Sequence, residues 1–125
     1  MGQQQLLLIV LGVIIVGVAI VVGINVFSAN AILSNRDGVV TDLNNLAANA
    51  QQFYRKPTSM GGGGNSFIGW AVPAELDTTP NGTYTATVTS QIVTIVGKGN
   101  EKYAGSVIQH TATVRSSAIT TVQNN

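Results

Sequence analysis

The stretch LLLIVLGVIIVGVAIVVGI, residues 6–24, sets the architecture of this 125-residue chain. It contains no charged side chain, and the first charged residue of the whole sequence is Arg36. As an α-helix these 19 residues would be about 28 Å long, close to the roughly 30 Å hydrocarbon thickness of a bilayer. A helix that is apolar on every side needs a cover on every side. We therefore expect residues 6–24 to lie in lipid or among copies of the same segment.

Three interpretations of this segment are open. A secretory signal peptide has a basic N-terminal region and an apolar core of about 7–15 residues. Here the core is longer, and the preceding residues 1–5, MGQQQ, include no Lys or Arg. A single-pass membrane anchor fits the length well. The third interpretation is a helix that leaves the membrane and forms the core of a helical assembly, and the sequence pattern after residue 24 favours it.

The helical pattern continues past the apolar stretch. Apolar residues recur at intervals of three, four and seven positions, which is typical of an amphipathic helix. A single helix is therefore predicted to extend to about Arg55, because Pro57 cannot continue it. Gly38 is the one expected weak point in the amphipathic half of this helix. The stripe that we expect to pack against the rest of the chain consists of Val39, Val40, Leu43, Leu46, Ala47, Ala50, Phe53 and Tyr54.

A small β region is predicted to follow the helix. Residues 57–66 include four consecutive glycines and read as a flexible connector. They lack the Lys-Ser/Thr pair of a phosphate-binding loop. Strands are predicted at 67–72, 83–88, 92–96, 103–115 and 118–122, with turns at 89–91 and 97–102. On the long strand we expect Ile108, His110, Ala112 and Val114 to share one face.

The sequence thus predicts an α+β fold in which four or five antiparallel strands cover the amphipathic half of a long helix. The domain organisation has three parts. Residues 1–56 form the N-terminal helix, 57–66 the connector, and 67–125 a C-terminal β domain at the surface.

Composition argues against most kinds of chemistry. Six basic and five acidic residues leave the chain near neutral, so nucleic acid is not an expected partner. Charged residues are 9% of the chain, against about 25% in typical soluble proteins. There is no cysteine, and His110 is the single histidine, so no metal or cofactor is expected. Without a convergent set of catalytic residues, we do not expect an enzyme.

Asn81-Gly82-Thr83 has two readings. It matches the sequon for N-glycosylation, and Asn-Gly after Pro80 is also a turn signal. The sequence favours the turn over a glycan at Asn81.

The order of these features resembles type IV pilins and their relatives, the pseudopilins and the archaeal pilin subunits. The resemblance rests on residues 1–56 and on the order of the loop and strands after them. Gly2-Gln3 is similar to a prepilin-peptidase cleavage site, with a glycine before a polar residue and an apolar helix. The chain departs from the bacterial pattern, because no glutamate lies near its N-terminus. Gln5 occupies the fifth position, or Leu7 if cleavage follows Gly2.

The resemblance implies that this chain is the major subunit of a pilus-like extracellular filament, a homopolymer of identical copies. Before assembly the helix would be held in inner (cytoplasmic) membrane lipid, with prepilin peptidase and pilus assembly machinery as partners. The alternative is a membrane-anchored minor pseudopilin or tethered binding module that forms no long fibres. The residues expected to form the filament core are Gln5, Leu6, Leu7, Ile9, Val10, Val13, Ile14, Val16, Val18, Ile20, Val21, Ile24 and Phe27.

Overall fold

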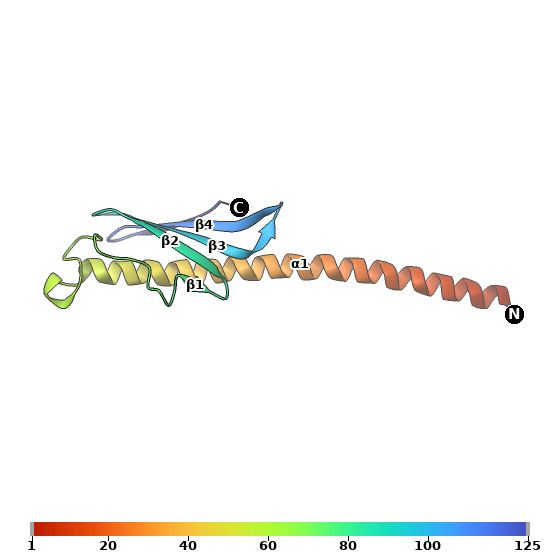
Figure 1. The fold of residues 1–125 in the computed structure, drawn as a ribbon. Coiled ribbons are helices and arrows are strands. Elements are labelled where there is room, and N and C mark those ends of the chain that lie inside the picture. Colours follow the sequence, from red (N-terminus) through yellow and green to blue (C-terminus); the bar gives the residue numbers. More distant parts are fainter. Residues whose placement is uncertain (1, 125) are drawn as a thin grey trace. The chain divides into compact units, whose positions relative to one another are not determined.

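The computed structural model describes residues 2–124 and shows an α+β protein (Figure 1). Its elements are helix α1 (Gly2–Arg55), a short 3-10 helix η1 (Thr58–Met60) and strands β1 (Thr78–Thr79), β2 (Gly82–Val88), β3 (Val93–Tyr103), β4 (Ser106–Val114) and β5 (Ile119–Gln123). The strands form one antiparallel sheet in chain order. The predicted fold class is confirmed.

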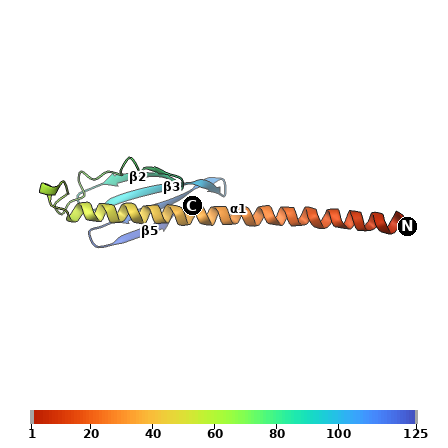
Figure 2. The ribbon, with the colours of Figure 1, turned by 90° about the horizontal axis from the view of Figure 1, so that it is seen from below.

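The chain divides into two compact units, Met1–Ala31 and Ile32–Asn125, and α1 contributes to both. The first unit is helical throughout its described residues. The second unit contains the remainder of α1, the loop after it and the whole sheet. Within this second unit the helix runs across the sheet, with β2 and β3 visible on one side of it and β5 on the other (Figure 2).

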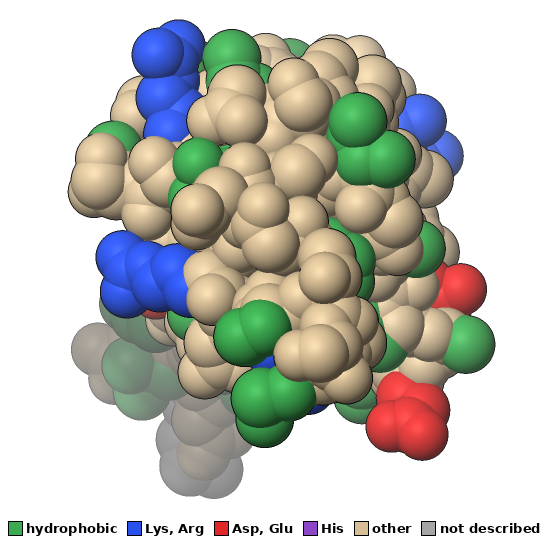
Figure 3. Space-filling model, turned by 90° about the vertical axis from the view of Figure 1, so that its left-hand side faces the viewer, with side chains coloured by type: hydrophobic (Ala, Val, Ile, Leu, Met, Phe, Trp, Pro, Cys, Tyr) green, Lys and Arg blue, Asp and Glu red, His purple; other side chains and the backbone are tan. Residues whose placement is uncertain are grey.

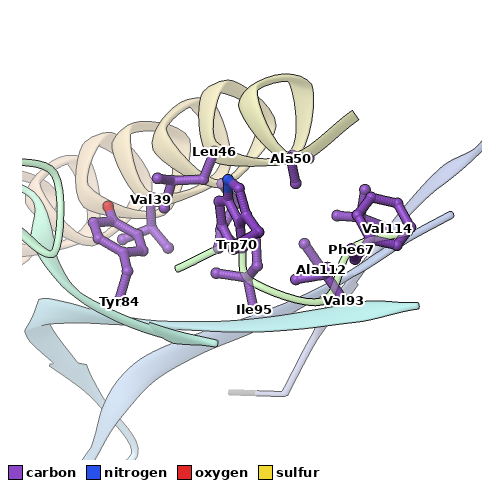
Figure 4. Close-up of a cluster of buried hydrophobic side chains, with 12 residues drawn as sticks. Val39, Leu46, Ala50, Phe67, Trp70, Tyr84, Val93, Ile95, Ala112 and Val114 are labelled. Carbon is purple, nitrogen blue, oxygen red and sulfur yellow. The ribbon is translucent and has the colours of Figure 1, made fainter. Parts of the chain in front are cut away.

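The core of the second unit lies between α1 and one face of the sheet. Alternating strand residues point toward the helix, and the helix residues that meet them are spaced by three or four positions. The large side chains drawn in Figure 4 fill the space between the two layers. The buried apolar residues are Val39, Leu43, Leu46, Ala47, Ala50, Phe67, Trp70, Tyr84, Val93, Ile95, Ile108, Ala112 and Val114.

The glycine-rich segment forms a cap on the end of α1. The last carbonyl groups of a helix have no partner within it. Here the N–H of Gly63 donates to the carbonyl of Phe53 at 2.8 Å, and the N–H of Asn65 donates to the carbonyl of Tyr54 at 2.7 Å. Residues 57–66 are therefore a folded capping loop, where the sequence predicted a flexible connector. Composition alone cannot separate the two, because the capping bonds depend on where the loop returns.

Residues 67–72 do not form the strand that their composition predicts. The N–H of Trp70 donates to the carbonyl of Phe67 at 2.9 Å, which closes a turn, and Gly69 has a φ of 97°. The aromatic rings of Phe67 and Trp70 are buried in the core. These side chains gave the segment its β-like composition. They fill the space near the end of α1, but they do so from a loop and not from a paired β-strand.

The predicted turn at 97–102 is also wrong, because these residues continue β3. The turn lies at Ala104 and Gly105, whose φ values of 53° and 83° fit a tight hairpin. Gly97 serves close packing instead: a Cβ there would lie 2.8 Å from Cε1 of Tyr84 and 3.1 Å from Cγ1 of Val39. Consequently β4 begins at Ser106, three residues later than predicted.

The other strand predictions agree with the structure. Strands β2 and β5 match the predicted segments to within one residue at each end, and β2 pairs with β3 as the predicted hairpin. The N–H of Thr89 donates to the carbonyl of Ile92 at 2.9 Å and closes the turn between them. The two-residue strand β1 was not predicted. Two threonines before Pro80 carry too little periodic pattern to indicate a strand.

Candidate functional site: an uncovered apolar helical segment

The main candidate for a functional surface is the apolar segment, defined here as residues 6–27 of α1. Its large apolar side chains are exposed to between 53% and 76%, from Leu11 to Phe27. Every described residue from 2 to 30 is exposed. Isolated apolar residues on a protein surface are ordinary, but a continuous apolar surface of this length marks a site of contact with a membrane or another protein.

All the residues predicted for the filament core lie on the exposed part of α1: Gln5 directly precedes the apolar segment, and the others belong to it. Five further apolar residues are exposed to a similar degree and were missing from the prediction: Leu8, Leu11, Ile15, Val22 and Val26. The nearly uniform hydrophobicity of residues 6–27 is the sequence feature that could have identified these five residues. A segment that is apolar on all sides offers no reason to prefer one face.

The composition and length of this part of the chain also suit a membrane. Among the described residues, α1 is the one helix long and apolar enough to cross a bilayer. Its first turn contains no acidic residue. Because the segment has neither charge nor periodic polarity, its surface can be covered by acyl chains or by other apolar helices.

Three glycines interrupt the apolar segment, although no close contact within the single chain requires a glycine at these positions. A Cβ added at Gly12, Gly17 or Gly23 would meet nothing within 4 Å. Glycine in a helix costs up to about 1 kcal/mol relative to alanine. In packed membrane helices the same residue allows two backbones to approach closely. Gly12, Gly17 and Gly23 are therefore positions at which another helix could approach the backbone of α1 closely.

The second unit, by contrast, has a complete core of its own. Of the residues predicted for helix-to-sheet packing, Val39, Leu43, Leu46, Ala47 and Ala50 are buried. Phe53 and Tyr54 are partly buried and pack against the same cluster, and the Tyr54 ring lies 4.7 Å from that of Phe67. Val40 is half-buried and lies outside the cluster. This core uses no residue of the apolar segment.

A polar cluster attaches the β1–β2 turn to the helix. One carboxylate oxygen of Asp42, Oδ2, accepts hydrogen bonds from the Tyr84 hydroxyl (2.6 Å), the Thr79 hydroxyl (2.7 Å) and the Asn81 amide (3.1 Å). One helical turn earlier, a Cβ at Gly38 would lie 2.5 Å from the Asn81 amide oxygen. Gly38 thus gives the turn room to approach, and α1 is continuous through it, although the sequence marked it as a weak point.

The pKa values in this cluster follow from its geometry. Burial alone would raise the pKa of Asp42, but the hydrogen bonds from Tyr84, Thr79 and Asn81 outweigh it and hold that pKa below its ordinary value. Burial and the hydrogen bond to Asp42 raise the pKa of the Tyr84 hydroxyl, so it remains a donor at neutral pH.

Replacement of Asp42 by alanine is expected to lower the free energy of unfolding of the second unit by about 2–3 kcal/mol, because buried donors lose a charged acceptor. The folded pKa of Asp42 lies below 3.8, so its contribution is complete above that pH and is lost as the pH falls further. As the pH falls, the variant should therefore lose less of its free energy of unfolding than the wild-type chain does. Urea unfolding between pH 2 and pH 7, followed by Trp70 fluorescence, measures both effects. The exposed Asp37→Ala is the matched control, and an equal loss in that variant would contradict the role of Asp42.

Asn81 lies in the tight turn between β1 and β2, as the turn reading of the sequence predicts. Its side-chain nitrogen, the atom that an N-glycan would occupy, donates to Asp42. The residue is half-buried against α1. A glycan on the folded protein would have to break this contact.

His110 is the most deeply buried polar residue among those described, at 4% exposure on β4. Burial and the nearby Arg36 guanidinium lower its pKa, which keeps the imidazole neutral. The Arg36 guanidinium also lies 4.9 Å from the centre of the Tyr103 ring, a cation–π contact. Within residues 2–124, no three His, Asp or Glu side chains come together to hold a metal ion. The contact between Arg36 on α1 and Tyr103 on β3 joins the helix to the sheet.

The surface of the chain carries few charges. On the face shown in Figure 3, most of the surface is backbone or side chains that are neither charged nor hydrophobic, and charged side chains are few and scattered. Gly2 and Gln3, the predicted peptidase site, are exposed in the first turn of α1. Comparison with protein families, with curated proteins and with solved structures finds no match to this chain.

Proposed function

We propose that this chain is the major structural subunit of a pilus-like extracellular filament, in which copies of the apolar segment cover one another. The observation that carries the proposal is the contrast between the two units. The second unit is closed around its own core, whereas the seventeen large apolar side chains of residues 6–27 are left uncovered by residues 2–124. A cover for them has to come from outside.

The magnitude of this exposure argues against a freely dissolved monomer. Full burial of one large apolar side chain stabilises a structure by about 1.5–3 kcal/mol. If only a third of that were realised over the segment, release of one subunit into water would cost about 8–17 kcal/mol. Such a polymer would persist without covalent links between subunits.

Lipid would satisfy the same requirement, and it is the predicted state of the subunit before assembly. The hydrophobic effect does not distinguish lipid from a neighbouring apolar helix, because acyl chains are as apolar as leucine. Packing distinguishes them. The open glycines at positions 12, 17 and 23 favour close contact between helices, which supports the filament over an anchor that stays in the membrane.

Electron microscopy of material sheared from cells that produce the full chain tests the proposal. Long fibres that consist mainly of this chain by mass spectrometry are the expected result. Recovery of the chain only as single copies from the detergent-solubilised membrane fraction would instead support the anchored accessory protein. Removal of residues 2–31 provides the control, because that form lacks the apolar segment and should yield no fibres.

A further inference from the structure

We propose that Gln3, once cleavage after Gly2 makes it the first residue, closes into a pyroglutamate ring, so that the mature N-terminus carries no charge. This inference rests on the proposed function, because it requires that cleavage and the burial of the first helical turn among other copies. It adds a covalent modification and a chemical reason for the residue at position 3.

Among residues 2–31, the described part of the first unit, no acidic side chain is present to pair with a positive charge at the N-terminus. Helix α1 has no acidic residue in its first turn. Along the sequence, the first acidic residue is Asp37, well beyond the first unit. Leu6 and Leu7, which follow within about a turn of Gln3, are exposed to 62% and 69% and would be covered in the assembly. Gln4 and Gln5 could accept hydrogen bonds but would leave the charge uncompensated.

A free α-amino group at Gln3 would be unfavourable there for two reasons. With an ordinary pKa of about 7.7–8.0, it is largely protonated at neutral pH. Its positive charge would then lie at the positive end of the helix dipole, where anions are preferred. Burial of that charge among apolar helices, without a counter-charge, adds a desolvation penalty. A neutral end group removes both effects.

The side chain of Gln3 can remove the charge by itself. The α-amino nitrogen attacks the side-chain carbonyl carbon Cδ and forms a five-membered lactam. The bond from Cδ to Nε2 breaks, and Nε2 leaves as ammonia with the proton that the α-nitrogen gives up. Atoms and electrons balance without an oxidant or a co-reactant. Gln4 and Gln5 cannot react in this way, because their backbone nitrogens are in peptide bonds.

The test is an intact-mass measurement on the full chain as cells process it, from both filaments and membranes. We expect the mass of the chain that begins at Gln3 less one ammonia, and no N-terminal labelling by an amine-reactive reagent. Gln3→Asn is the matched control, because it keeps a carboxamide but would need a strained four-membered ring. That variant should be cleaved, keep the full mass of the chain that begins at position 3 and react with the reagent.

A wild-type N-terminus that begins at Gln3 with a free amine would overturn the inference, as would a chain that retains Met1 or Gly2. The reason for the ring comes from burial in the filament, but the two measurements can fail separately. Filaments whose subunits keep the free amine would refute the proposed lactam but not the proposed filament. Membrane-bound single copies that carry the lactam would refute the proposed filament but not the lactam.

Discussion

Replacement of Ile14 by lysine is expected to abolish filaments while residues 32–125 remain folded. Ile14 lies in the middle of the apolar segment and is 57% exposed in the single chain. In an assembly its side chain would be surrounded by other apolar helices, where an unpaired ammonium group is strongly unfavourable. Val18→Asp introduces the opposite charge one turn later and should have the same effect. Electron microscopy of sheared material measures filament yield, and circular dichroism of the purified chain in detergent reports the fold.

Two comparisons show whether packing or membrane insertion is affected. Ile14→Leu keeps the apolar surface and should form normal filaments. Lysine also makes insertion of the helix less favourable by about 3 kcal/mol, so the amount of each variant in the membrane fraction has to be measured. Normal filaments from either charged variant would contradict burial of the segment among its copies.

Replacement of the glycines by leucine distinguishes contact with lipid from contact with other helices, and it does so without introducing a charge. Because a Cβ at Gly12, Gly17 or Gly23 meets nothing in the single chain, each replacement should leave folding and insertion intact. In the filament, a large side chain at a helix contact would force two backbones apart. We expect reduced filament yield from at least one of the three variants. Normal yield from all three would show that close packing at the glycines is not needed.

The second large effect is expected within the folded unit. Leu43 is fully buried between α1 and the sheet, so Leu43→Ala should lower the free energy of unfolding by about 2–5 kcal/mol. The loss combines the transfer of the removed methyl groups with the cavity that remains. Urea unfolding of the full chain in detergent, followed by the fluorescence of Trp70, measures the change. Trp70 is the only tryptophan and belongs to the same core.

Leu33→Ala is the matched control on the same helix, since Leu33 is 55% exposed. Its replacement should change the stability by less than about 0.5 kcal/mol. Equal losses in the two variants would contradict the placement of Leu43 between helix and sheet. The pair also tests the boundary between the amphipathic stripe and the surface of α1.

Features that depend on local periodicity could be predicted from the amino-acid sequence. Uniform hydrophobicity defined the apolar segment, the spacing of Leu43 and its neighbours defined the face of α1 that the sheet covers, and Pro57 set the helix end. The hairpin between β2 and β3 followed from alternation and a short turn. Each of these signals is contained within a few residues, so no knowledge of distant contacts was required.

The role of residues whose partners are far away in the sequence emerged only from the folded structure. The sequence predicted a strand at Phe67 and Trp70, but these residues fill the core from a loop. It predicted a turn at Gly97, but this glycine lies in β3 and allows the sheet to approach α1. Gly38 and Asp42 contact the β1–β2 turn, which lies some forty residues later in the sequence. Aromatic and glycine residues give the same local signal whether they serve a strand, a turn or a close contact. The physical reason is that burial and hydrogen-bond satisfaction are properties of the assembled layers, which local propensity does not contain.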